Sequence, residues 1–365
     1  MKNIIKTLIV MLSSVSLFAS ANAGEVGVSG SAKATYNIQS GKTNAGKGLG
    51  VTNELNFTAS GELDNGFTWN YSMELDPTTT GDSAATPTNT QPGAALNDDT
   101  KLTLSTPYGT FGVFISEGGL DVEDAASQSV YARPTDIGDP SATSDNFSID
   151  SYNNVQYHTP ADLLPFGTSF KIAYATNPSD VEMGSSGNNA GASTTKTATS
   201  GATSATEMQI KTSPIDGLTL GASHFAADGE GVAKNDQESE SGAYYATYAT
   251  GPVSIGYSKA YKAPFLQNFV RSNGTNTTAT VEYYDQTNYS IAFAATDDLS
   301  VSYERETSEA NKLDKTSVEQ ESSAVQVAYT MGGMTLAVSH ASHDNNGYTD
   351  GNNTDQTVFA VTMAF

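Results

Sequence analysis

Apolar and polar side chains alternate with a period of two through most of the chain after residue 23. Between Phe67 and Asp76, every second residue is large and apolar, and those between them are Thr, Asn, Ser, Glu and Asp. The final residues, 359–365, repeat this pattern. A strand places such apolar side chains on one face, whereas a helix would scatter them around its axis. The alternation therefore predicts β-strands with one apolar and one polar face.

About sixteen segments show this alternation, each near the roughly 9–11 residues that a tilted strand needs to cross a bilayer. We expect strands at 25–37, 50–63, 66–76, 98–106, 110–117, 150–158, 167–176, 204–213, 217–226, 240–250, 252–262, 282–296, 299–308, 319–331, 334–343 and 355–365. Every second connection is a short turn rich in Gly, Pro or Asx residues. The other connections are longer and polar, at 38–49, 77–97, 118–149, 177–203, 227–239, 263–281, 309–318 and 344–354.

Short turns at one end of the strands and long loops at the other are expected of a membrane barrel. We therefore predict one all-β domain over 24–365, a transmembrane antiparallel β-barrel of about 16 strands with short periplasmic turns and long external loops. The mean hydropathy of −0.34 is compatible with this fold, because only alternate residues of a barrel strand face lipid. A soluble β-sandwich would alternate in the same way, but the loop asymmetry and the terminal Phe365 favour the barrel.

The first 23 residues have the three parts of a secretory signal peptide. Lys2 and Lys6 supply positive charge, 8–18 is a short apolar core, and Ala21 and Ala23 form an Ala-x-Ala cleavage site. The core is shorter than the roughly 20 residues of a membrane-spanning helix. We therefore expect residues 1–23 to be removed on export, and the absence of cysteine excludes disulfides in the exported chain.

The chain is strongly acidic, with 40 acidic residues against 17 basic ones and a net charge of −23. Two of the 17 basic residues lie in the expected signal peptide, so the exported chain is more acidic still. Such a charge repels nucleic acids and attracts cations. We therefore expect no nucleic-acid partner.

Motifs that would indicate catalysis or cofactor binding are incomplete. Gly41-Lys42-Thr43 ends like a phosphate-binding loop, but Tyr36 stands where the first glycine belongs. His340 and His343 are three residues apart, which places them on opposite faces of a strand and prevents them from binding one ion. The segment 344–351 lacks the closing Glu of a calcium loop. We expect no catalytic residues, no metal, no cofactor and no enzymatic activity.

Four segments carry a resemblance to a known family. Leu55–Gly66 resembles a strand and tight turn of the Gram-negative general porins, which are trimeric and 16-stranded, and particularly of their alphaproteobacterial type. Thr106–Gly112 resembles the next turn, and Tyr152–Pro160 resembles the strand after the loop that folds into the pore. Phe365 matches the terminal aromatic residue that the barrel-assembly machinery reads in this family, so we expect Phe365 to be an assembly signal.

The resemblance implies that the third long loop, 118–149, forms a constriction inside the barrel, where its acids face basic residues of the wall. The candidate constriction residues of this loop are Asp121, Glu123, Asp124, Arg133, Asp136 and Asp139. Alternation places a second set on the lumen face of the strands, and these candidate pore-wall residues are Lys33, Glu54, Glu62, Glu74, Lys101, Lys171, Lys211 and Glu304. The chain departs from enteric members of the family, because it has three arginines instead of a basic wall cluster rich in arginine.

Together these features predict a porin of the Gram-negative outer membrane, through which small hydrophilic solutes and ions diffuse passively with a preference for cations. The expected partners are outer-membrane lipid and lipopolysaccharide, the barrel-assembly machinery and two further copies of the chain in a homotrimer. Two alternatives remain open at this point. One is a substrate-selective porin with a saturable binding track, and the other is a secreted β-rich adhesin or surface protein that forms no channel.

Overall fold

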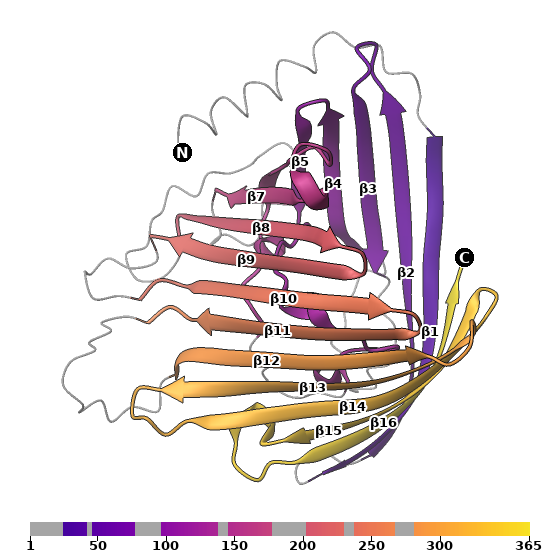
Figure 1. Cartoon of the computed structure of the whole chain (residues 1–365), viewed down its shortest axis with the longest axis vertical. Helices are drawn as coiled ribbons and strands as arrows, with labels where there is room; N and C mark the ends of the chain where they lie inside the picture. Colours follow the sequence, from indigo (N-terminus) through magenta and orange to yellow (C-terminus); the bar gives the residue numbers. More distant parts are fainter. Residues whose placement is uncertain are drawn as a thin grey trace, which may run out of the picture.

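A computed structural model describes residues 25–41, 46–76, 96–137, 145–176, 202–229, 237–266 and 281–365 of the chain. Sixteen strands in this part of the chain form one closed barrel (Figure 1). The predicted signal peptide and Asp139 lie outside the described residues. The strands are β1 (Glu25–Gly41), β2 (Gly46–Glu62), β3 (Thr68–Asp76), β4 (Leu96–Thr106), β5 (Gly109–Ile115), β6 (Asn154–His158), β7 (Ser169–Ala175), β8 (Ser204–Ile215), β9 (Leu218–Asp228), β10 (Glu240–Thr250), β11 (Val253–Ala263), β12 (Val281–Ala294), β13 (Leu299–Lys312), β14 (Val318–Met331), β15 (Met334–Asp344) and β16 (Thr354–Ala364).

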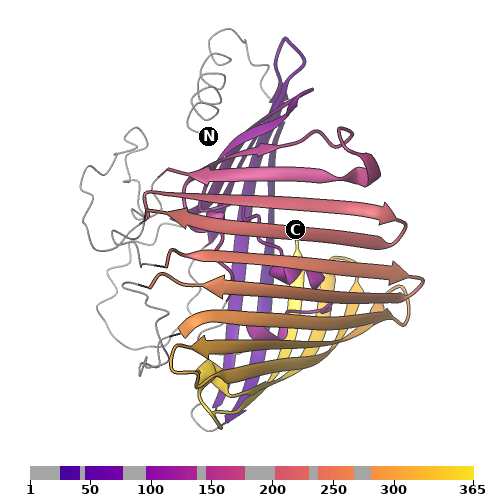
Figure 2. The same ribbon diagram turned by 60° about the vertical axis from the view of Figure 1, so that its left-hand side comes forward.

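Each strand pairs antiparallel with its neighbours in the sequence, and β1 pairs with β16 to close the barrel (Figure 2). The predicted all-β antiparallel barrel is therefore confirmed. Most connections at one end of the strands are short turns and most at the other end are longer, which defines a short-turn end and a long-loop end. Among the described residues, no helix is long and apolar enough to span a membrane.

The alternating side chains of the strands face either the interior or the exterior of the barrel. On β14, Val325 and Val327 expose 58% and 41% of their surface, whereas their neighbours Ala324 and Gln326 are buried on the inner side. Apolar side chains cover the outer face of the barrel, where a lipid environment would bury them. The polar face of each strand therefore lines the interior.

The seam between β1 and β16 is held by eleven residue pairs, from Ser31 opposite Ala364 to Gly41 opposite Thr354. Phe365 extends the seam beyond the last strand residue. Its backbone N–H donates to the carbonyl of Gly30 at 3.0 Å, and its own carbonyl accepts from the N–H of Gly30 at 2.8 Å. The backbone of the terminal residue thus takes part in closing the barrel.

Four predicted strand boundaries are wrong by four residues, and others differ by one or two. The predicted loops 38–49 and 309–318 are shorter, because the flanking strands continue to Gly41 and Lys312. These polar stretches pair because the neighbouring strand offers a ladder of hydrogen bonds, as between Gln39 and Gly46. The strand predicted at 150–158 begins at Asn154, because the side chain of Asn154 binds the carbonyls of Ile149 and Tyr152 and ends the preceding loop there.

Candidate pore constriction

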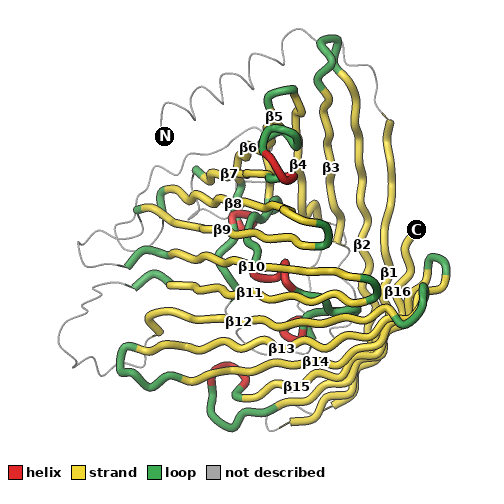
Figure 3. Tube along the Cα trace, viewed as in Figure 1, coloured by secondary structure: helices red, strands yellow, loops and turns green. Residues whose placement is uncertain are grey.

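The connection between β5 and β6 folds into the barrel instead of standing outside it. It contains three helical turns, η1 (Glu123–Ala126), η2 (Pro134–Asp136) and η3 (Ile149–Ser151). Figure 3 shows them in red behind the front strands. The described residues 118–137 and 145–149, which we call the constriction loop, contact the inner wall from β6 to β15 through polar side chains of the strands.

The base of the constriction loop is fixed to β6 and β8. Gln209 Nε2 donates to the carbonyl of Leu120 at 2.9 Å. Glu207 is fully buried, and its Oε2 atom accepts hydrogen bonds from the backbone N–H groups of Leu120 at 3.3 Å and Ile149 at 2.9 Å. Leu120 and Ile149 also pack with Phe225 of β9 in an apolar cluster. One wall carboxyl therefore holds both the outgoing and the returning chain.

The first helical turn of the loop lies directly against the backbone of β11. Ser258 Oγ donates to the carbonyl of Glu123 at 2.8 Å, and Ser290 Oγ donates to the carbonyl of Ala126 at 2.6 Å. A Cβ atom at Gly256 would overlap the carbonyl oxygen of Ala126. Gly256 has an ordinary strand conformation, so the glycine is needed for this close approach and not for its backbone angles.

The middle of the loop is held by β13 and β14. Glu304, fully buried, accepts hydrogen bonds from Ser127 Oγ and Ser129 Oγ, both at 2.6 Å. Gln326 accepts from the N–H of Tyr131 at 2.9 Å. Glu304 points inward as the alternation predicts, but the loop covers it, so it anchors the loop and does not face the open lumen.

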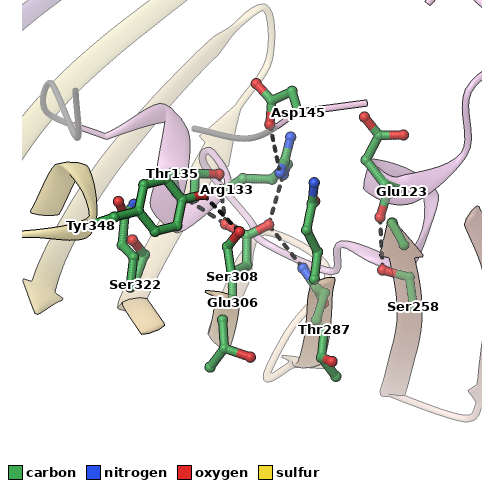
Figure 4. Close-up of a pocket in the computed structure, with 15 residues that line it drawn as sticks. Glu123, Arg133, Thr135, Asp145, Ser258, Thr287, Glu306, Ser308, Ser322 and Tyr348 are labelled. Carbon is green, nitrogen blue, oxygen red and sulfur yellow. Dashed lines mark hydrogen bonds and ion pairs between the residues drawn. The ribbon is translucent and has the colours of Figure 1, made fainter. Parts of the chain in front are cut away.

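Arg133 joins the loop to the wall through an ion-pair network (Figure 4). Its Nε atom donates to Glu306 Oε1 at 2.9 Å, and its terminal nitrogens pair with Asp124 and, at 3.7 Å, with Asp145. Glu306 also accepts from the N–H of Thr135 at 3.1 Å and from its hydroxyl at 2.6 Å. The single basic residue of the loop is therefore occupied by three acids, and its side chain is only 12% exposed.

The described part of the loop next meets β15. His343 is buried, with Nε2 2.8 Å from the carbonyl oxygen of Ile137 and Nδ1 2.9 Å from Ser322 Oγ. His340 is exposed on the opposite face of the same strand, where its Nδ1 lies 2.9 Å from Thr357 Oγ1. The two histidines thus lie apart, as their spacing predicts.

The loop acids differ in ionisation. Burial, reinforced by the charges of Asp121 and Asp124, raises the pKa of Glu123 to about 9, so this carboxyl is neutral at pH 7. Desolvation raises the pKa of Asp124 to about 7, although half of its side chain is exposed and Arg133 opposes the shift. Glu123 is buried, and its Oε1 accepts the N–H of Asn146 at 2.9 Å. Asp136 is exposed and Asp121 half-buried.

The predicted wall residues fall into separate groups. Lys33 of β1 and Glu54 of β2 line a cavity beside Tyr131. Lys101 of β4 pairs with Glu117. The strand register places the remaining residues. Lys171 lies level with His158 and Gln209, and Lys211 lies nearer the short turns than Gln209. Glu62 lies at the short-turn end of β2, and Glu74 lies opposite Asn56.

Sequence reasoning missed the residues that hold the loop. Glu207 and Glu306 bind the loop, and Asn288 supports the wall carboxylates that do so. All three are inward-facing polar residues, which look the same in sequence as residues that line open water. Asn288 donates from its side chain to both Glu304 and Glu306, at 3.1 Å in the second case. A large acidic or amide residue in the middle of a strand could indicate such an anchor. The sequence does not show, however, whether the loop or open water covers that side chain.

A closed barrel with a polar interior, narrowed by a loop docked on its inner wall, is the architecture of a diffusion channel. Comparison with known proteins agrees. A family model described as Gram-negative porin matches residues 7–365, and the chain belongs to this family. It is accordingly an outer-membrane channel protein for passive diffusion. No curated protein sequence matches the chain.

Solved structures share the fold at low sequence identity. An anion-selective porin from Comamonas acidovorans has a TM-score of 0.66 at 10% identity, over 94% of this chain and all of the other. The trimer form of OmpT, an outer membrane protein of Vibrio cholerae, has a TM-score of 0.60 at 12% identity, over 94% of this chain and 100% of that one. A variant of the Rh. blastica porin has a TM-score of 0.57 at 13% identity, over 93% and 100%.

Proposed function

We propose that this porin prefers cations and that the constriction loop sets this preference. The supporting observation is the charge balance of the loop. Its single basic residue, Arg133, is neutralised by Glu306, Asp124 and Asp145. Asp121 then remains without a basic residue of the loop to balance it, and Asp136 is an exposed acid that Arg133 balances only in part. Charge in a narrow passage with low-dielectric walls has a strong effect on permeating ions, because field lines are focused there.

Wall lysines oppose this field in part. Lys101 is paired with Glu117, so its charge is balanced locally. Lys171 and Lys211 lie together on β7 and β8, with Lys171 level with the anchor Gln209 at the base of the loop and Lys211 nearer the short turns. Charges more than about 8 Å from the ions are screened at physiological salt, so charge at the constriction outweighs the total charge of the chain. The anion-selective relative has the same fold, so the sign of selectivity must come from such side chains.

We expect Asp121→Asn to shift the zero-current potential of refolded protein toward anions in a planar bilayer under a salt gradient. Glu123→Gln should leave this potential unchanged at pH 7, because Glu123 is already neutral there. Its raised pKa means that the carboxyl loses its proton as the pH rises through about 9. The parent channel should therefore become more cation-selective between pH 7 and pH 10 than the Glu123→Gln variant does.

Asp216→Asn is the matched control, because Asp216 is an exposed acid in the short turn between β8 and β9. It should change the potential much less than Asp121→Asn does, and the difference should grow at low salt. Equal shifts from Asp121→Asn and Asp216→Asn would assign the selectivity to total charge and remove the constriction loop as its source.

Two further features complete the proposal. We propose a homotrimer, which the porin architecture and the trimer form of the Vibrio cholerae relative support. We also propose that residues 1–23 are removed on export and that lipopolysaccharide surrounds the barrel. The non-channel surface protein considered above is excluded by the family assignment. The substrate-selective porin would differ from the general one by a saturable interaction with its solute.

The terminal residue is proposed to direct assembly. Deleting Phe365 should strongly lower the amount of protein inserted into the outer membrane while export continues, because the deletion removes both the aromatic ring and two seam hydrogen bonds. Phe365→Ala retains the backbone hydrogen bonds and separates the two causes. Heat-modifiable migration of membrane fractions on gels measures the folded amount. Normal insertion of both variants would show that Phe365 is not a signal.

A further inference from the structure

A cavity of about 450 Å³ lies between the middle of the constriction loop and the wall strands β1, β2, β15 and β16. Val130 and Tyr131 of the loop form one side of this cavity. The wall side of the cavity is lined by Lys33, Glu54, Thr52, Thr335 and Thr362. Most anchoring contacts of the loop lie on other strands, and Val130 and Tyr131 are themselves held there by Ser302 and Gln326.

The two charged groups of the cavity do not neutralise each other directly. The ammonium group of Lys33 lies over the ring of Tyr131, 5.8 Å from its centre. The carboxylate of Glu54 accepts a hydrogen bond from Asn56 Nδ2 at 2.8 Å. In the register of β1 and β2, Lys33 lies opposite Thr52 and Ser31 lies opposite Glu54, so the two charges are diagonal neighbours on one face. Diagonal Cα positions are roughly 7–8 Å apart.

We propose that this cavity is a subsite for zwitterionic amino acids in the permeation path. The carboxylate of the solute would bind Lys33, its ammonium would bind Glu54, and an apolar side chain would lie against Tyr131. Each half of the cavity matches one group of the solute. A simple anion would meet Glu54 unfavourably and a simple cation would meet Lys33 unfavourably, whereas a zwitterion satisfies both. The inference rests on the proposed diffusion function and narrows its class of solute.

The threonine hydroxyls add hydrogen-bonding capacity without charge, since each can donate and accept. A solute with fixed opposite charges gains from both charged contacts, whereas a sugar gains from the hydroxyls alone. This difference separates the proposed class from neutral sugars of similar size. The site is open to the lumen, so it would bind weakly and release readily, as a channel requires.

The test measures ion current through refolded protein in planar bilayers with L-leucine added to the potassium chloride bath. We expect leucine to reduce the current in a saturable way. Leucinamide, which lacks the carboxylate, 4-methylpentanoate, which lacks the ammonium, and glucose should each have a much weaker effect. Lys33→Met and Glu54→Gln should each weaken the block by leucine roughly fivefold, the size expected for one solvent-exposed charge contact.

Two matched variants act as controls. Lys211→Met and Glu62→Gln remove the same charges from lumen-facing positions outside the cavity and should leave the block by leucine unchanged. Tyr131→Ala should weaken the block by leucine but not that by glycine, which has no side chain to place on the ring.

The outcomes distinguish the subsite from the channel. Potassium chloride conductance with a block by leucine that does not saturate, or that Lys33→Met and Glu54→Gln leave unchanged, would overturn the subsite and leave the channel intact. Stronger block by glucose than by leucine would also overturn it, in favour of a sugar site. Absence of any conductance from the folded barrel would instead count against the proposed diffusion function.

Discussion

Replacing Arg133 with methionine is expected to release the tip of the constriction loop from the wall. The variant keeps an unbranched apolar side chain but leaves Glu306 buried without its cation. Removing one partner of a buried ion pair costs about 3–5 kcal/mol. That cost falls on docking of the loop, since the hydrogen-bond ladder of the barrel does not involve Arg133. Single-channel recordings should therefore show frequent current fluctuations and a higher mean conductance, while the heat-modifiable shift of the barrel stays unchanged.

Two companion variants sharpen this test. Arg133→Lys keeps the charge but loses the planar fork that contacts Glu306 and Asp124 together, so it should restore the parent behaviour only in part. Combining Arg133→Met with Glu306→Leu removes both members of the pair, so the double variant should show smaller current fluctuations than Arg133→Met alone. Steady, parent-like currents from Arg133→Met would mean that the remaining wall contacts suffice to hold the loop tip.

Replacing Gly256 with valine is expected to displace the first helical turn of the loop. Valine is a good strand former and Gly256 has a strand conformation, so β11 itself should tolerate the change. Its side chain would occupy the space of the Ala126 carbonyl. The loop must then move toward the lumen, which should lower single-channel conductance and raise its noise.

Gly50→Val is the matched control on β2. Gly50 has the same inward parity as Glu54, but the nearest atom to an added Cβ would be Thr35 Oγ1 at an ordinary 3.6 Å. This variant should keep the parent conductance far better than Gly256→Val. If both glycine variants changed the conductance equally, bulk added to the lumen and not displacement of the loop would explain the effect.

Most of the fold could be predicted from the alternation of apolar and polar residues along the strands. Because side chains of a strand alternate between its two faces, Val325 and Val327 had to share one face and Gln326 the other, and all sixteen strands follow from such runs. Strand ends were less predictable. The stretch around Gly46 is polar and Gly-rich, and it pairs only because β1 lies beside it.

The candidate site was less accessible to sequence reasoning for a physical reason. Parity shows that Glu304 points inward, but it does not show that Ser127 and Ser129 cover it. Likewise, Glu123 and Asp121 look equivalent in sequence, although one is buried and neutral and the other is half-buried. How deeply each side chain is buried, and which residues cover it, depends on the path of the loop across the lumen. That path is set by many contacts between residues distant in sequence.

The pairing of Gly30 with Phe365 bears on how the chain can fold. These residues lie at opposite ends of the barrel sequence, yet their backbones hydrogen-bond in both directions. Contacts between residues so far apart in sequence form slowly, because the loop-closure entropy must be overcome first. Until the seam closes, β1 and β16 each present an open edge that can pair with another chain. A chain of this topology therefore depends on being kept from aggregating before closure, and the speed of that single pairing step should limit its yield.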